Sequence, residues 1–196
     1  MSGGHNPAGG DRQEPSEGGS WRLDHPAIAK VAAALAESGQ HEAADGIRVL
    51  PAEVRTAAQA AEALGVEVGA IANSLIFRAV FTDPADSVAP LLALTSGAHR
   101  ADTGVLAALI GAAEVGKAEP AFVKAHTGQA IGGVAPVGHP EPLLTVVDRA
   151  LAGHEVVWAA AGHAKAIFPT TFAGLIALTD GRAADVTARS GDSVVS

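Results

Sequence analysis

The stretch from Thr127 to His139 concentrates the residues best suited to present main-chain groups to a ligand. It holds four glycines and one proline in thirteen residues, and Gly132 and Pro136 form a G-x-x-x-P pattern. Glycine lets a ligand approach the backbone closely, and proline stiffens the end of a loop. Such a loop can offer N–H groups to a carbonyl or phosphate oxygen. The alternative is a strand–turn–strand corner without a ligand, which the spacing alone favours.

Other patterns that carry chemistry are missing from the sequence. There is no phosphate-binding G-x-x-x-x-G-K-[ST] and no G-x-S-x-G, and none of the eight histidines lies four residues from another,. The chain has no cysteine, which excludes a thiol nucleophile and a disulfide framework,. We therefore expect neither a metal site nor a cofactor.

Three polar residues near turns are further candidates for a site. His139 follows the proline of the loop by three residues, and His163 precedes a short apolar segment. Histidines at such places are more often surface or capping residues than catalysts. Asp148 ends an apolar strand, where a carboxylate can be catalytic, cap a turn or pair with an arginine. Capping is the interpretation that we favour for Asp148.

Composition limits the class of protein. Hydrophobic residues make up 48% of the chain and aromatic residues 4%, so the core must be built from Ala, Val, Leu and Ile. A net charge of −8 argues against broad DNA or RNA binding but allows a small pocket for one nucleotide or acyl group,. No apolar run reaches the roughly 18–20 residues that span a bilayer, and the N-terminal stretch lacks the apolar core of a signal peptide. We expect a cytoplasmic protein.

The elements that must position these residues alternate between helices and strands. Residues 1–21 and 190–196 read as disordered tails, and 22–189 as a single domain,. Asp24 and Pro26 predict the start of a first helix, and Thr56 and Gly65 bound a second. Strands are expected at 47–50, 71–81, 89–95, 112–117, 143–147, 155–160, 164–168 and 184–187, with further helices at 103–110, 120–126 and 171–178. This order predicts an α/β (α+β) fold in which helices surround a mixed, largely antiparallel sheet.

The run from Thr127 to His139 resembles the central signature of the YbaK/prolyl-tRNA-synthetase-associated editing-domain family. Separate stretches agree with that family in order and spacing, and together they span about residues 25–188: 71–77, 91–102, 144–148, 156–162 and 171–186. The resemblance implies a mixed α/β domain that hydrolyses wrongly charged aminoacyl-tRNA, often tRNA(Pro) carrying a small amino acid.

The resemblance also implies roles for individual residues. The loop would hold the aminoacyl ester at the tRNA 3′ end, and the catalytic residues would be Asn73, Gly132 and Gly133. Substrate binding would fall to Ser74, Thr127, Pro136, His139, Asp148, Gly162 and His163. Fixed N–H donors would stabilise the charge on the ester oxygen while water attacks, and an alanine-lined pocket would exclude larger side chains. The expected partners are the aminoacyl-tRNA 3′ end and, as a further candidate, a synthetase, with no membrane and no DNA.

One position departs from the family pattern. Many relatives carry a lysine just before the Ser/Thr of the first central strand, where this chain has Asn73 followed by Ser74. The segment 162–172 also lacks the carboxylate that some relatives carry there. Either Asn73 is used differently, another cation substitutes, or activity is weak or lost. A non-catalytic module that binds an aminoacyl or nucleotide ligand, and a partner-binding domain with an unused pocket, are the alternatives.

Overall fold

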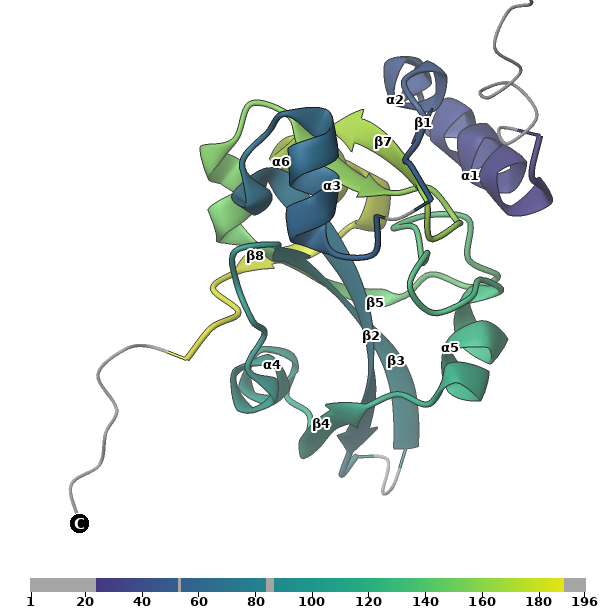
Figure 1. The fold of residues 1–196 in the computed structure, drawn as a ribbon. Coiled ribbons are helices and arrows are strands. Elements are labelled where there is room, and N and C mark those ends of the chain that lie inside the picture. The colour runs from purple at the N-terminus through teal and green to yellow at the C-terminus, as the bar shows by residue number, and fades with distance from the viewer. Residues whose placement is uncertain (1–23, 53, 84–86, 189–196) are drawn as a thin grey trace, which may run out of the picture.

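The structure is a computed structural model that describes residues 24–52, 54–83 and 87–188 (Figure 1). The two predicted tails, 1–21 and 190–196, lie outside these residues. Within the described ranges, no helix combines the length and apolar character needed to cross a membrane.

An eight-stranded mixed sheet forms the centre of the fold. Its order is β1-β7-β6-β2-β3-β5-β8, with β4 paired to β2. Four of its seven strand pairings are antiparallel and three are parallel, as the sequence predicted. The strands are β1 Arg48–Val49, β2 Ile71–Phe81, β3 Ser87–Ser96, β4 Glu114–Lys117, β5 Leu144–Asp148, β6 Val157–Ala160, β7 Ala166–Thr170 and β8 Arg182–Ala184.

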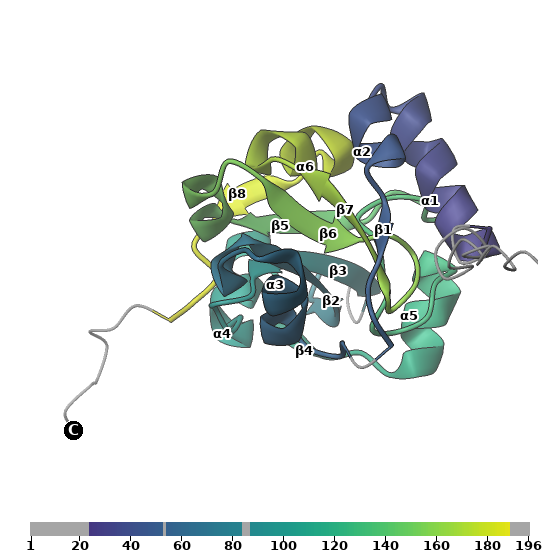
Figure 2. The same cartoon turned by 45° about the horizontal axis from the view of Figure 1, so that its top comes forward.

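Helices cover both faces of this sheet. Figure 2 shows α1, α2 and α6 on one side and α3 and α4 on the other. The helices are α1 Pro26–Glu37, α2 His41–Asp45, α3 Ala57–Leu64, α4 Thr103–Ile110, α5 Pro120–Thr127 and α6 Phe172–Thr179, with short 3-10 helices η1 Val68–Ala70 and η2 Arg149–Gly153. The predicted mixed α/β class is therefore correct.

Helix starts follow local side-chain chemistry. Thr56 caps α3, because its hydroxyl accepts a hydrogen bond from Gln59 N at 3.2 Å,. The prediction that Asp24 caps α1 is wrong: His25 is the cap, and its Nδ1 accepts from Ala27 N at 3.2 Å. Pro26 explains the difference, since a residue before proline is pushed to extended angles, and His25 has φ −62° and ψ 129°,.

Several strand limits differ from the prediction. The strand β8 covers Arg182–Ala184 rather than 184–187, and β7 covers Ala166–Thr170 rather than 164–168. The short helix α2 was not predicted at all. Its five residues are too few for a periodic signal, and its formation depends on packing against α1 and β7,.

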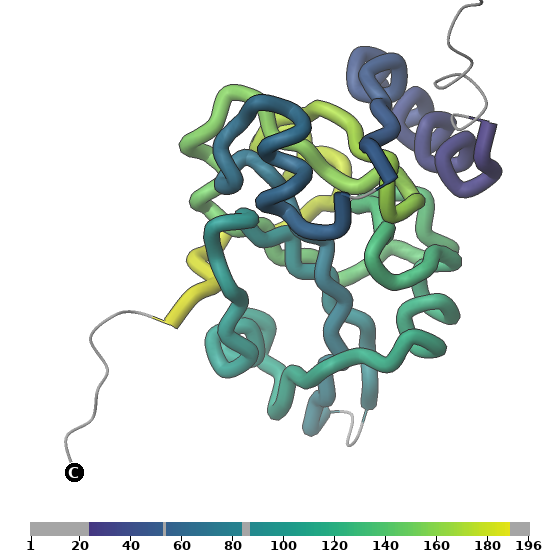
Figure 3. The backbone as a smooth tube through the Cα atoms, viewed as in Figure 1, coloured from purple at the N-terminus to yellow at the C-terminus, as the bar shows by residue number. Residues whose placement is uncertain are grey.

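The core is aliphatic, as the composition requires. A cluster that includes Leu35, Leu92, Leu94 and Phe168 packs beneath α1 and α6, and smaller clusters lie beneath α3 and α4. The tube in Figure 3 shows the loop after α5 running beside α1. A Cβ added at Gly138 would lie 3.8 Å from Val31 Cγ2, so this loop packs directly on α1.

Candidate functional site

The candidate site lies where β2 changes its neighbour in the sheet. On this edge, β2 pairs with β6 only at Ile71 and Ala72, and it pairs with β4 from Phe77 onward. The stretch 73–76 between them has no strand partner on this side, among the residues that the structure describes. A cavity of about 240 Å³ opens at this interruption, and both Asn73 and Ser74 line it.

The direction of the peptide groups in β2 follows from two hydrogen bonds. Ile71 O accepts from Gly97 N at 2.7 Å on the β3 side, and Val80 O accepts from Ala113 N at 2.8 Å on the opposite side. Peptide groups alternate along a strand. The N–H and C=O of Ser74 therefore face the unpaired edge, where a ligand can take the place of a strand.

The glycine-rich loop forms another wall of this cavity and is braced from within. Gln129 is buried, and its Nε2 donates to Val137 O at 2.9 Å while its Oε1 accepts from Ala135 N at 2.7 Å. The buried Thr127 hydroxyl donates to Val123 O at 2.7 Å and accepts from Gln129 N at 3.0 Å. Thr127 thus fixes the start of the loop instead of lining the cavity. Sequence reasoning missed Gln129, although a polar residue between glycines was a visible signal.

Two amides remain available among the loop residues that line the cavity. Gly133 N donates to Ala130 O at 3.2 Å, and Ala135 N is held by Gln129. In the part of the chain that the structure describes, the N–H groups of Gly132 and Val134 have no protein acceptor, and both residues line the cavity. These two N–H groups can donate to a ligand oxygen without breaking a hydrogen bond within the protein.

The two neighbouring glycines serve different purposes. Gly132 has φ +89°, and a Cβ there would meet nothing within 4 Å. Gly133 sits against the turn between β6 and β7, where an added Cβ would lie 2.5 Å from Ala164 N. Gly133 is needed for this close approach of two backbones, whereas Gly132 is needed for its backbone conformation.

The rest of the cavity wall is small and apolar. The residues that sequence reasoning did not assign to the site come from the segment before α3, from α3, from β2, from the loop and from the β6–β7 hairpin: Leu50, Val54, Arg55, Thr56, Ala57, Ala60, Ile71, Ala72, Leu75, Val134, Trp158, Ala160, Ala164, Ala166 and Ile167. Arg55 is the charged residue of the lining, which contains no histidine and no carboxylate among the described residues. Ser74 Oγ and Trp158 Nε1 are buried without a hydrogen-bond partner within those same ranges, so the wall has unused polar capacity,.

Pro136 and His139 line a different hollow on the α1 side of the loop. Its volume is about 620 Å³, and Lys30 and Glu37 also contribute to it. His139 Nε2 lies 2.7 Å from Ala135 O and so carries a proton that it donates there. Burial lowers the pKa of His139 below its ordinary value of 6.5, with the charge of Lys30 acting in the same direction,. His139 is therefore neutral at pH 7.

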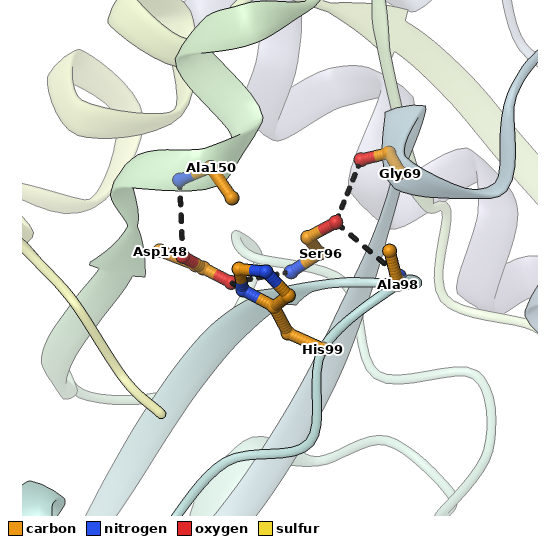
Figure 4. Close-up of polar contacts among 6 residues, drawn as sticks. All are labelled: Gly69, Ser96, Ala98, His99, Asp148 and Ala150. Carbon is orange, nitrogen blue, oxygen red and sulfur yellow. Dashed lines mark hydrogen bonds and ion pairs between the residues drawn. The ribbon is translucent and has the colours of Figure 1, made fainter. Parts of the chain in front are cut away.

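Asp148 lies in a separate polar cluster and lines neither hollow (Figure 4). Its Oδ2 accepts from Ser96 N at 3.1 Å and lies 2.8 Å from His99 Nδ1, and its Oδ1 accepts from Ala150 N at 3.0 Å. The last bond caps η2, in agreement with the capping interpretation. The buried carboxylate joins the ends of β3 and β5.

Gly162 and His163 lie at the β6–β7 turn beneath α1 and line neither hollow. Gly162 has φ +85°, and a Cβ there would lie 2.7 Å from Ala27 O, so only glycine lets α1 pack here. His163 Nδ1 accepts from Lys165 N at 3.2 Å, and its ring centroid is 4.9 Å from that of His25. Desolvation first, and then the charges of His25 and Lys165, lower the pKa of His163. Of the residues predicted for the site, Asn73, Ser74 and Gly132 share the small cavity.

Comparison with known proteins identifies a family for this chain. The model of the aminoacyl-tRNA editing domain matches residues 51–178. A solved structure described as that of a candidate trans-editing enzyme for prolyl tRNA synthetase is 40% identical, with a TM-score of 0.75, over 84% of this chain and 98% of that chain. A scaffold protein used for epitope backbone grafting is 37% identical, with a TM-score of 0.75, over 83% and 98%. A hypothetical protein is 26% identical, with a TM-score of 0.68, over 81% and 99%.

No curated protein matches the chain at a significant level. The family match covers more than half of the sequence, including every residue that lines the small cavity except Leu50. The chain therefore belongs to the aminoacyl-tRNA editing domain family.

Proposed function

We propose that this protein is a trans-editing deacylase that hydrolyses the ester between a small amino acid and the 3′ end of a mischarged tRNA. The observation that carries the proposal is the convergence of Gly132, Val134 and Asn73 on one small cavity. The two loop residues bring N–H groups without protein acceptors among the described residues, and Asn73 brings a carboxamide. All three groups can donate to an oxygen that gains negative charge.

The reaction needs no nucleophilic side chain. Water adds to the ester carbonyl carbon, and the carbonyl oxygen becomes an oxyanion that the loop amides stabilise. The tetrahedral intermediate then collapses, the bond to the ribose oxygen breaks, and that oxygen takes up the proton that the attacking water has lost. Because no histidine or carboxylate of the described residues lines the cavity, a Ser74 alkoxide has no base to form it,. We therefore propose that the substrate itself orients the attacking water, because the ribose carries a free hydroxyl next to the ester.

The size of the cavity supports a small acyl group. The lining includes four alanines, which have short side chains: Ala57, Ala60, Ala160 and Ala164. The larger Trp158 and Ile167 also line the cavity. A site of this kind selects small amino acids by excluding larger side chains, because closely packed walls cannot move far enough to accept them. Alanyl-tRNA and seryl-tRNA are accordingly the substrates to test first. The first tRNA to test is tRNA(Pro), because the 40% identical protein is described as a trans-editing enzyme for prolyl tRNA synthetase.

The charge of the chain supports a narrow contact with tRNA. At a net charge of −8, a broad phosphate-binding surface is unfavourable, so recognition concentrates at the acceptor end,. A synthetase could deliver the substrate, and the cytoplasm, where tRNA is charged, is the proposed compartment.

A binding module without catalysis is the second candidate. The observation that favours it is the uncharged Asn73 in a cavity whose described lining holds no general base. Such a module would hold an aminoacyl or nucleotide ligand through the same amides and release it unchanged.

Amino-acid release from a panel of mischarged tRNAs tests the deacylase. We expect release of a small amino acid at a rate that rises in proportion to protein concentration. Absence of release from the whole panel, together with binding of a non-hydrolysable amide-linked aminoacyl-adenosine, would establish the binding module instead. Absence of both would leave the cavity without a role.

A further inference from the structure

The mouth of the cavity must face the nucleotide to which the acyl group is attached. This step rests on the proposed function. The ester joins the amino acid to the ribose of the terminal adenosine, so a bound acyl group places that adenosine directly outside the cavity. Residues that line the cavity and are also exposed are therefore in position to contact it.

Two large apolar side chains flank this mouth. In the described part of the chain, five large hydrophobic side chains are exposed: Leu75, Val88, Ile131, Leu144 and Val156. Leu75 lines the cavity and is 38% exposed, and it belongs to the stretch of β2 that lacks a strand partner on one edge. Ile131 directly precedes Gly132 and is 57% exposed. Ile131 is not part of the lining itself, but it is the chain neighbour of Gly132, which is. Single exposed apolar residues are common, but two at the opening of one cavity can form a surface for a flat apolar group.

The same cavity carries one positive charge. Arg55 lines it and is exposed, just before the cap of α3. Its backbone is anchored, because Arg55 N donates to Gln59 Oε1 at 2.9 Å, while the guanidinium can reach outward. A guanidinium binds phosphate oxygens through two parallel hydrogen bonds. No acidic residue of the described lining opposes this charge.

We propose that Leu75 and Ile131 form an apolar platform for the terminal adenine base, and that Arg55 binds the phosphate on the 5′ side of that adenosine. The platform uses the face of the base, and the phosphate contact uses the backbone, so the subsite reads the shape of the 3′ end rather than a nucleotide sequence. This subsite lets an acidic protein bind the 3′ end of tRNA without an extended basic surface.

Three esters of alanine separate the parts of this subsite: alanine methyl ester, 2′(3′)-O-alanyl-adenosine and the same compound with a 5′-phosphate. The wild-type protein should give kcat/KM values that rise along this series. The double variant Leu75→Ser, Ile131→Ser should lose about tenfold more on both adenosine esters than on the methyl ester. Arg55→Gln should lose a similar factor on the phosphorylated ester alone.

Matched controls exclude general effects of the substitutions. Leu144→Ser removes an apolar side chain that is 44% exposed on β5, and Arg100→Gln removes an exposed charge, both outside the cavity lining. Both controls should behave as wild type on all three esters. Thermal unfolding of each variant verifies that the fold is retained.

The outcomes separate this inference from the proposed function. Equal rates on the methyl and adenosine esters, or unchanged rates in the double variant, would overturn the platform while leaving the deacylase intact. An unchanged preference for the phosphate in Arg55→Gln would remove Arg55 from the subsite. If sedimentation showed that the double variant disrupts a dimer while hydrolysis is unaffected, Leu75 and Ile131 would instead form a contact between two copies of the protein. Failure of the wild-type protein on the esters and on mischarged tRNA would reject the proposed function itself.

Discussion

Replacing Gly132 with alanine tests whether main-chain amides carry the chemistry. Gly132 has φ +89°, and the space around an added Cβ is empty to 4 Å. The cost of the substitution is therefore backbone strain, about 1–2 kcal/mol, and not a steric clash. The loop relieves that strain by rotating its peptide groups between Ile131 and Val134. This rotation turns the free N–H groups of Gly132 and Val134 away from their present direction.

The expected effect on catalysis is larger than the effect on stability. Loss of one donor to a developing oxyanion typically lowers kcat by about 10²–10³. Because the carboxamide of Asn73 remains and the rotation displaces the amides only in part, we expect the lower end of this range, about a hundredfold. KM should change little, since the amides act mainly on charge that develops in the transition state.

The chain offers a matched control for the strain. Gly111 ends α4 with φ +70°, and an added Cβ there also meets nothing within 4 Å. Gly111→Ala should therefore lose a similar free energy of unfolding, but it lies outside the cavity lining. Urea unfolding measures the stability of both variants, and single-turnover release of the amino acid from mischarged tRNA measures catalysis.

A clear result would refute the reasoning. If both variants lost the same stability and both kept the wild-type rate, the Gly132 amide would have no part in the reaction. Hydrogen exchange gives a second measurement that does not depend on the variant folding. The amide of Gly132, which is exposed, should exchange fast in the free protein and slowly with a bound non-hydrolysable analogue, and equal exchange in both states would contradict the proposed contact.

Three further outcomes follow from the contacts around the site. Gln129→Ala should lower the free energy of unfolding by about 1–3 kcal/mol, because it leaves buried loop groups without partners, and urea unfolding measures this loss. Asp148→Asn should also destabilise the protein, by about 1–3 kcal/mol, yet it should leave deacylation unchanged, since this carboxylate caps η2 and lines no part of the cavity; a comparable loss of rate would contradict that placement. The folded-state pKa of His139 is lowered, so the unfolded chain binds more protons. The stability linked to His139 is therefore complete above the ordinary pKa of 6.5 and is lost as the pH falls below it. His139→Gln should flatten that part of the profile of unfolding free energy against pH, and an unchanged profile would assign it to another group.

Local chemistry explains which parts of the fold could be predicted. The helix α3 was placed correctly because Thr56 and Gly65 mark its two ends by side-chain capping and by a left-handed angle. The long hairpin of β2 and β3 was visible as two apolar runs around a turn. The short strand β1 was also predicted, at 47–50. By contrast, α2 depends on packing against distant segments, which no short window of sequence records.

The residues of the candidate site also divide into those that the sequence could predict and those that it could not. Asn73, Ser74 and Gly132 were placed together because the stretches 71–77 and 127–139 both resemble one family, although Asn73 itself departs from its pattern and the two stretches lie far apart in the sequence. Other lining residues, such as Val54 and Ala60, come from segments that carry no motif, so only the folded chain reveals them. Proximity in sequence was also a poor guide, since His139 follows the loop closely and yet lines the hollow on its other side.

The interruption beside β2 connects the fold to the proposed chemistry. A strand that exchanges one neighbour for another must leave peptide groups unpaired between them, and those of Ser74 are left on the edge where the loop brings the free amides of Gly132 and Val134. Unpaired backbone groups are costly unless water or a ligand binds them. Under the proposed function, an ester oxygen accepts hydrogen bonds from the N–H groups at this edge. The site is therefore built from main-chain geometry, which explains why the sequence shows no catalytic side-chain motif and why an asparagine at position 73 is compatible with a binding cavity that remains intact.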